Sequence, residues 1–210
     1  REAIVALPLF GFGLAAVVSA STPLLLAGAI CGLIFVYCQA HILLAAKGIP
    51  AWRHPLIVPL MVVTGLTEGL GLFAIFAVLA DVERPVVQAL ALGLPVLIGL
   101  RHLAWRAYRR DLGAHGAPTA TFKALDNSWL KLSLWHQLLP AGLVVAGLVA
   151  GWMLPILLVI ASLLVVASGW TFKYTLITKA AFNQGYAVER MPARGAGDSA
   201  RGVKPGWALS

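Results

Sequence analysis

One carboxylic acid stands in the middle of a long apolar stretch, and it is the residue most able to do chemistry. The stretch runs from Pro55 to Ala80 and contains Glu68, with Thr64 one helical turn earlier on the same face. About 20 apolar residues cross a bilayer, and an ionisable group at mid-depth costs about 3 kcal/mol or more unless it faces inward. We expect Glu68 and Thr64 to form a proton path or, in the simpler case, a neutral acid that hydrogen-bonds two helices together.

A second set of polar side chains is expected at one depth, near the end of the bundle that carries most of the positive charge. Tyr37 and His41 lie four residues apart on one predicted helix, so they share a face. On another predicted helix, Arg101 lies about 10 Å below the membrane boundary, judged from a rise of ~1.5 Å per residue. Such groups can bind a carbonyl-bearing ring, such as a quinone, and exchange protons with it. The predicted quinone-binding residues are Arg1, Glu2, Tyr37, His41, Arg101, Lys173 and Tyr174.

Haem and iron–sulfur clusters are the competing uses of the histidines and cysteines. Only His41 and His102 could pair around a haem, and both are predicted to lie near the surface. Cys31 and Cys38 are two helical turns apart, about 10 Å, which is too far for a disulfide, and two thiols are too few for a cluster. We therefore expect ubiquinone or menaquinone as the cofactor, with no haem, iron–sulfur cluster, metal site or catalytic residue in this chain.

The composition predicts the elements that must position these groups. The chain has 210 residues, of which 60% are hydrophobic and 11% charged, and its mean hydropathy is +0.88, whereas soluble domains are about 25% charged. This predicts an all-α integral membrane protein with a bundle of six transmembrane helices at residues 1–184. The spans are expected near 3–20, 24–46, 56–80, 86–108, 136–152 and 155–177, with a cytoplasmic tail at 185–210 that is rich in Gly, Ala, Arg and Pro.

The basic residues predict the orientation of this bundle. With six spans, fifteen of the sixteen Lys and Arg residues fall on the side of the termini, and Arg84 alone falls on the other. The positive-inside rule then makes the termini and the connections at 47–54 and 109–136 cytoplasmic, in a bacterial inner membrane. The net charge of +8 suits anionic lipid or an acidic partner and needs no nucleic acid.

The 109–136 connection contains one amphipathic pattern. Phe122, Leu125, Trp129 and Leu132 recur at helical spacing, with charged residues elsewhere on the helical wheel. The pattern favours a helix that lies at the membrane interface. A docking surface for a soluble subunit is the alternative.

Three segments carry a resemblance. Residues 1–4 (REAI) resemble the end of a Ser-Trp-x-Ser-Arg-Glu-type segment, residues 47–55 (KGIPAWRHP) resemble a Pro-x-Trp connection, and residues 169–185 (GWTFKYTLITKAAFNQG) resemble a common C-terminal ending. All three are similar to segments of membrane-anchor subunits of the dimethyl sulfoxide reductase type, which are distantly related to polysulfide reductase anchors.

The resemblance implies a larger assembly. Members of this family have eight helices, so two N-terminal helices would be missing from this chain. They hold a four-cluster iron–sulfur subunit that connects a molybdopterin catalytic subunit, with molybdenum or tungsten, to membrane quinone. The acid at the position of Glu2 is one that the family is thought to use at its quinone site, whereas Glu68 departs from the dimethyl sulfoxide reductase anchors.

The charge distribution adds a direction to this resemblance. Docking on the basic side would make the catalytic subunit cytoplasmic. The resemblance then implies a complex like the family's cytoplasmic relatives, which oxidise their substrate and reduce quinone, in anaerobic or sulfur respiration. The expected substrate is sulfite or a compound of the phenylacetyl-CoA type. The alternative is a proton-coupled secondary transporter in which Glu68 carries the coupling proton, although internal repeats are not evident in the sequence.

Overall fold

The computed structural model describes residues 2–114, 116–133 and 137–182, and it describes their side chains except those of Glu2 and residues 127–133. Arg1 and the tail expected at 185–210 lie outside these residues. In the part of the chain that is described, the helices are α1 (Glu2–Ser19), α2 (Thr22–Ala45), α3 (Ile57–Leu79), α4 (Arg84–Asp111), α5 (Thr119–Ser133), α6 (Leu139–Ala150) and α7 (Leu154–Tyr174), and α7 continues as the π-helix η2 (Thr175–Lys179).

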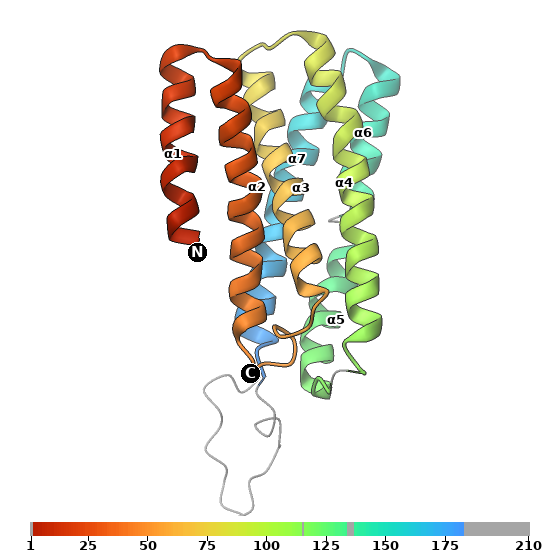
Figure 1. Ribbon diagram of the computed structural model, residues 1–210. Helices are drawn as coiled ribbons and strands as arrows, with labels where there is room; N and C mark the ends of the chain where they lie inside the picture. Colours follow the sequence, from red (N-terminus) through yellow and green to blue (C-terminus); the bar gives the residue numbers. More distant parts are fainter. Residues whose placement is uncertain (1, 115, 134–136, 183–210) are drawn as a thin grey trace, which may run out of the picture.

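The helices run up and down along one axis, with α5 packed at one end (Figure 1). We call the end with the α1–α2, α3–α4 and α6–α7 turns the upper end and the opposite end the lower end. Helices α2, α4 and α7 descend from the upper end, whereas α1, α3 and α6 ascend toward it. The two helices that contribute cations to the site described below, α4 and α7, therefore run in the same direction.

Four helices are long and apolar enough to cross a membrane: α2, α3, α4 and α7 with η2. They fit a multi-pass membrane protein, as the sequence predicts. Helices α1 and α6 are apolar but shorter, and α6 has 12 residues, about 18 Å at ~1.5 Å per residue against a hydrocarbon core of ~30 Å. Each expected span overlaps a helix whose ends lie within a few residues of those of the span. The crossing of a bilayer by α1 and α6 stays a prediction.

Proline and glycine mark the ends of these helices. Pro23, Pro85, Pro140 and Pro155 lie in the first turns of α2, α4, α6 and α7, where the missing N–H costs no hydrogen bond. Helix α6 ends at Ala150 and is capped by Gly151, whose φ of +66° is strained for other residues. The sharp turn there brings α7 back against α6.

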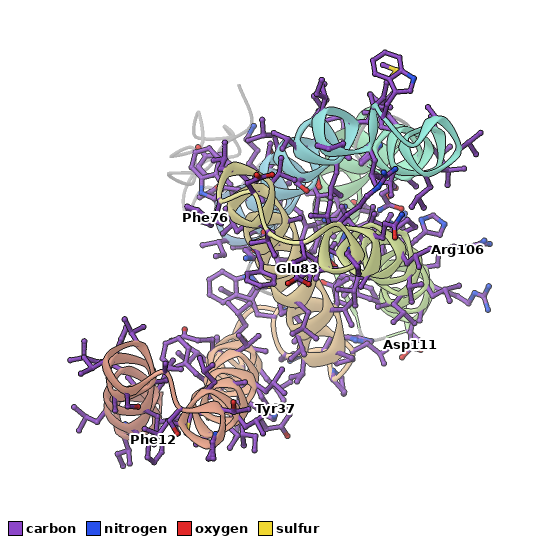
Figure 2. All side chains as sticks on the ribbon, turned by 90° about the horizontal axis from the view of Figure 1, so that it is seen from above. Phe12, Tyr37, Phe76, Glu83, Arg106 and Asp111 are labelled. Carbon is purple, nitrogen blue, oxygen red and sulfur yellow. The ribbon has the colours of Figure 1, made fainter. Side chains whose placement is uncertain are left out.

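The helices form two unequal groups (Figure 2). Helices α3, α4, α6 and α7 pack against one another, whereas α1 packs on α2 and is joined to the rest through the contact of α2 with α3. The close approach of α1 and α2 passes through small residues, because a Cβ on Gly28 would lie 3.6 Å from the backbone nitrogen of Gly13. Helix α2 therefore lies between α1 and α3.

The buried side chains form an upper and a lower cluster. The upper one lies between α3, α4, α6 and α7 and includes Leu94 and Leu158. The lower one includes Tyr108, Leu125 and Leu176 and joins α4, α5 and η2 to the loop between α2 and α3. Polar residues between these clusters occupy the middle of the bundle, which is where a site can form.

Helix α5 is the amphipathic helix that the sequence predicts within residues 109–136. Leu125 is buried and Phe122 packs against the lower cluster, so this part of the apolar face contacts protein. The side chains of Trp129 and Leu132 lie outside the described residues. Whether the helix also contacts lipid or a soluble subunit stays a prediction.

Candidate functional site

Glu68 occupies the midpoint of α3. Eleven residues separate it from each end of the helix (Ile57–Leu79), and its side chain is 14% exposed. It faces α7, where the absence of a side chain on Gly169 makes room for it. A Cβ at position 169 would lie 2.6 Å from Cδ and 2.8 Å from Cγ of Glu68, so only glycine fits beside the acid in this position.

Lys173 is the ionic partner of this acid. It lies one turn after Gly169 on α7, and its Nζ donates a hydrogen bond to Oε2 of Glu68. An uncompensated charge inside a bundle is costly, and pairing with hydrogen bonding offsets that cost. The Lys173 side chain is 29% exposed, so the pair lies at the edge of the bundle and is partly accessible from outside.

Arg101 brings a second positive charge to the same region from α4. Its side chain is buried, and Nη2 donates to Oγ of Ser168 over 2.9 Å, while Ser168 Oγ donates to the carbonyl of Val165. Ser168 directly precedes Gly169, the residue that Glu68 lies against. We call Glu68, Arg101, Ser168 and Lys173 the central charge cluster. It joins three helices and carries two basic side chains for one acid.

The two carboxylate oxygens of Glu68 differ in their hydrogen-bond partners. Oε1 of Glu68 is buried and has no hydrogen-bond partner within the described residues, whereas Oε2 binds Lys173. The arrangement allows Oε1 to accept a proton without loss of the contact between Oε2 and Lys173.

The threonines of α3 are buried but bind their own helix. The Thr64 hydroxyl donates to the carbonyl of Leu60 over 2.7 Å, and that of Thr67 donates to the carbonyl of Val63 over 2.6 Å. The Thr67 hydroxyl also lies 3.5 Å from the carbonyl of Leu97 on α4, whereas local bonding satisfies the Thr64 hydroxyl without a partner from another helix. The participation of Thr64 in a proton path with Glu68 stays a prediction.

Two of the other predicted quinone-binding residues contact each other rather than the central charge cluster. Tyr37 and His41 contact each other on α2, with ring centroids 4.4 Å apart, and no described hydrogen bond or ion pair joins them to the cluster. Tyr174 is 52% exposed. Glu2 begins α1, which packs on α2, but its side chain lies outside the description, as does Arg1. The structure thus brings together Glu68, Lys173 and Arg101 of the predicted set.

The two histidines considered for haem ligation turn to different neighbours. His41 contacts Tyr37, and its Nε2 is buried with no hydrogen-bond partner among the described residues. Nδ1 of His102 is 2.6 Å from Oε1 of Gln137, next to α6. Over the described residues, no three His, Cys, Asp or Glu side chains gather as a metal site would require, and Cys31 and Cys38 are free thiols.

Sequence reasoning missed how the loop at 47–55 is held. Trp52 Nε1 donates to the carbonyl of Leu176 over 3.0 Å, and Tyr108 Oη donates to the carbonyl of Ala51 over 2.9 Å. His54 is fully buried, with Nδ1 accepting from the backbone N–H of Leu56 and Nε2 3.2 Å from an oxygen of Asp111. The pattern Ala-Trp-Arg-His thus contains side chains that hold the lower end of the bundle together. In the sequence, the one indication of this role was the presence of tryptophan and histidine in a short polar loop.

The fold and the cluster define the class of protein: an all-helical chain with long apolar helices and a charged cluster at their middle. No family model, curated protein or solved structure matches the chain.

Proposed function

We propose that the chain is the membrane-anchor subunit of a molybdopterin and iron–sulfur oxidoreductase complex, in which it passes electrons between the iron–sulfur subunit and membrane quinone. The observation that carries the proposal is the partly accessible ion pair of Lys173 and Glu68 in the middle of apolar helices. Ionisable groups at such a depth are generally functional. The three segments that resemble dimethyl sulfoxide reductase-type anchors support the same function.

The residues of the cluster suit a quinone headgroup. A bound quinone accepts electrons and takes up protons on its ring oxygens. The ammonium of Lys173 is a hydrogen-bond donor for such an oxygen, and Oε1 of Glu68 can hold a proton in transit. Arg101, fixed by Ser168, favours negative charge nearby. Arg1, Glu2, Tyr37, His41 and Tyr174 are the remaining residues that we assign to quinone binding, with Thr64 on the proton path.

The partners are assigned to the lower end, which we place in the cytoplasm of a bacterial cell. Exposed basic side chains there are those of Lys47, Arg106, Arg110, Lys123 and Lys179, and they suit both anionic lipid and an acidic protein surface. A cytoplasmic catalytic subunit favours substrate oxidation coupled to quinone reduction, with sulfite or a phenylacetyl-CoA-type compound as the substrate.

The experiment that tests this function uses the complex purified from native membranes, after molybdenum or tungsten and iron have been measured in it. We expect Lys173→Met and Glu68→Gln each to lower quinone-coupled turnover by about 100-fold, the range of one acid–base group. Turnover with a soluble artificial acceptor should be unchanged, because the soluble subunits are intact. Glu83→Gln, an exposed acid at the end of the bundle opposite the proposed partners, is the matched control. Full quinone-coupled turnover in both site variants would refute the assignment.

The same ion pair also favours a second candidate, a proton-coupled transporter in which Glu68 carries the proton. Paired acids and bases inside membrane helices occur in proton relays of transporters. Purified protein in liposomes would then take up a small organic solute under an imposed pH gradient, and Glu68→Gln would abolish that uptake. Absence of uptake across a solute panel, together with copurified molybdenum or tungsten, decides for the anchor subunit.

A further inference from the structure

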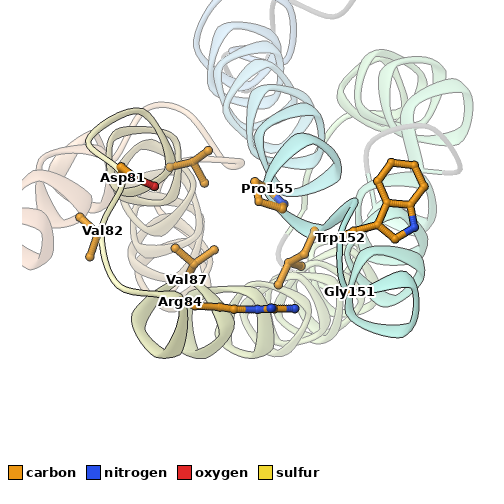
Figure 3. Close-up of a pocket in the computed structure, with 9 residues that line it drawn as sticks. Asp81, Val82, Arg84, Val87, Gly151, Trp152 and Pro155 are labelled. Atoms are coloured by element: carbon orange, nitrogen blue, oxygen red, sulfur yellow. The ribbon is translucent and has the colours of Figure 1, made fainter.

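A pocket of about 360 Å³ lies at the upper end of the bundle, between the α3–α4 turn and the α6–α7 turn (Figure 3). It lies at the opposite end of α3 from the loop at 47–55, and about 16 Å of helix separates its floor at the end of α3 from Glu68. The pocket is therefore distinct from the central charge cluster. Its lining residues are Val78, Asp81, Val82, Arg84, Val87, Gly151, Trp152, Leu154 and Pro155.

One acidic and one basic side chain line this pocket, and they do not form an ion pair with each other. Asp81 and Arg84 are both exposed, and neither side chain forms a hydrogen bond or ion pair within the described residues. Arg84 extends toward the α6–α7 turn, where its Nη2 lies 3.5 Å from the place a Cβ of Gly151 would take. Asp81 is held in the turn at a φ of +51°. A ligand with one positive and one negative group would satisfy both residues.

The remaining lining residues of the pocket are mostly apolar, and their position suits a pocket at the membrane surface. Val78, Val87 and Leu154 are contributed by the ends of three long apolar helices. Trp152 lies at the rim with 78% of its surface exposed, and tryptophan at the ends of membrane spans favours the headgroup level. Charged groups above an apolar wall match an amphiphile that has a polar head and hydrocarbon chains.

We propose that this pocket binds an aminophospholipid of the ethanolamine type. The Arg84 guanidinium binds the phosphodiester, for which its paired N–H donors are suited. The Asp81 carboxylate accepts hydrogen bonds from the primary ammonium, and the acyl chains lie along Val78 and Val87. An anionic phospholipid or free phosphate satisfies Arg84 alone and is repelled by Asp81. The sequence assigns to this end no other Lys or Arg than Arg84.

Thermal unfolding of the detergent-purified protein tests this site with three probes: dioleoyl phosphatidylethanolamine, dioleoyl phosphatidylglycerol and water-soluble phosphoethanolamine. We expect phosphatidylethanolamine to raise the Tm at the lowest concentration. Arg84→Gln should raise the concentration for half of this effect at least tenfold, and Asp81→Asn should remove the preference over phosphatidylglycerol. Glu83→Gln is the matched control, because Glu83 is an exposed acid in the same turn that does not line the pocket.

Two results would overturn the proposal. One is an unchanged half-effect concentration for phosphatidylethanolamine in Arg84→Gln, and the other is an equal Tm increase from soluble phosphoethanolamine, which would make the site one for a free metabolite. If Arg84→Gln does not fold, Arg84→Lys replaces it, since lysine keeps the charge but loses the paired donors. Native mass spectrometry then compares the retained phosphatidylethanolamine in wild type and Asp81→Asn, and equal retention would reject the assignment of the ammonium to Asp81.

Discussion

Replacement of Gly169 by alanine should disrupt the central charge cluster without any change of charge. The added methyl group would lie 2.6 Å from Cδ of Glu68, so the carboxyl group must leave its place beside α7. It would then lose its contact with Lys173. The atoms that the methyl group would meet belong to the flexible Glu68 side chain. We therefore expect this side chain to move and the backbone of α7 to stay in place.

The magnitude follows from the burial of the two partners. Breaking a fully buried ion pair costs about 3–5 kcal/mol, and since the Lys173 and Glu68 side chains are 29% and 14% exposed, we expect about 2–3 kcal/mol. Alanine is favoured over glycine in a helix by about 1 kcal/mol, which offsets part of this loss. The net destabilisation is about 1–2 kcal/mol, or a Tm decrease of about 2–8 °C for a chain of this size.

The assay is thermal unfolding in detergent, with a double-mutant cycle as the decisive measurement. In a Glu68→Ala background no carboxyl group remains to collide with, so Gly169→Ala should become neutral or stabilising. Gly69→Ala is the matched control, because a Cβ there meets no atom within 4 Å and only the gain in helix propensity remains. Equal destabilisation by Gly169→Ala in both backgrounds would refute the reasoning, since the effect would then not depend on Glu68.

Two further predictions concern the ends of the bundle. Glu2→Gln should abolish quinone-coupled turnover of the purified complex while turnover with an artificial acceptor continues, and unchanged quinone coupling would remove Glu2 from the site. Tyr108→Phe should destabilise the protein by about 1–2 kcal/mol, because the buried carbonyl of Ala51 loses its donor. Tyr174→Phe is the control in the same thermal unfolding assay, since Tyr174 is 52% exposed, and an equal effect of both changes would contradict the prediction.

The helices were predictable because apolar runs of membrane length alternate with prolines, glycines and charges. Each expected span overlaps a helix, and the prolines at 23, 85 and 155 lie in the first turns of helices where the apolar runs begin. Helix α6 (Leu139–Ala150) was less predictable in its extent. Its weaker signal comes from a short apolar run that follows an amphipathic segment, so no sharp change in polarity marks its start.

The site was predictable as a set of polar groups but not as a set of contacts. The mid-helix position of Glu68 follows from residue counting, whereas its partner Lys173 lies 105 residues away in sequence. Counting the rise per residue gives the depth of a Cα atom and placed Lys173 nearer the surface. Helical side chains, however, lean toward the N-terminus of their helix. Since α7 descends, Lys173 leans upward into the bundle and reaches Glu68, and Arg101 on the descending α4 does the same with Ser168.

Stability alone does not account for the central charge cluster. Replacing a buried ion pair by apolar residues of similar volume is often neutral or stabilising, so helices α3 and α7 could pack without Glu68 and Lys173. We therefore expect Glu68→Leu combined with Lys173→Met to leave the Tm within about 4 °C of wild type and to abolish quinone-coupled turnover. Each single change leaves one charge unpaired and should lower the Tm more than the double change does. A double variant with normal quinone-coupled turnover would assign the pair to packing, and one that fails to fold would assign it to assembly of the bundle.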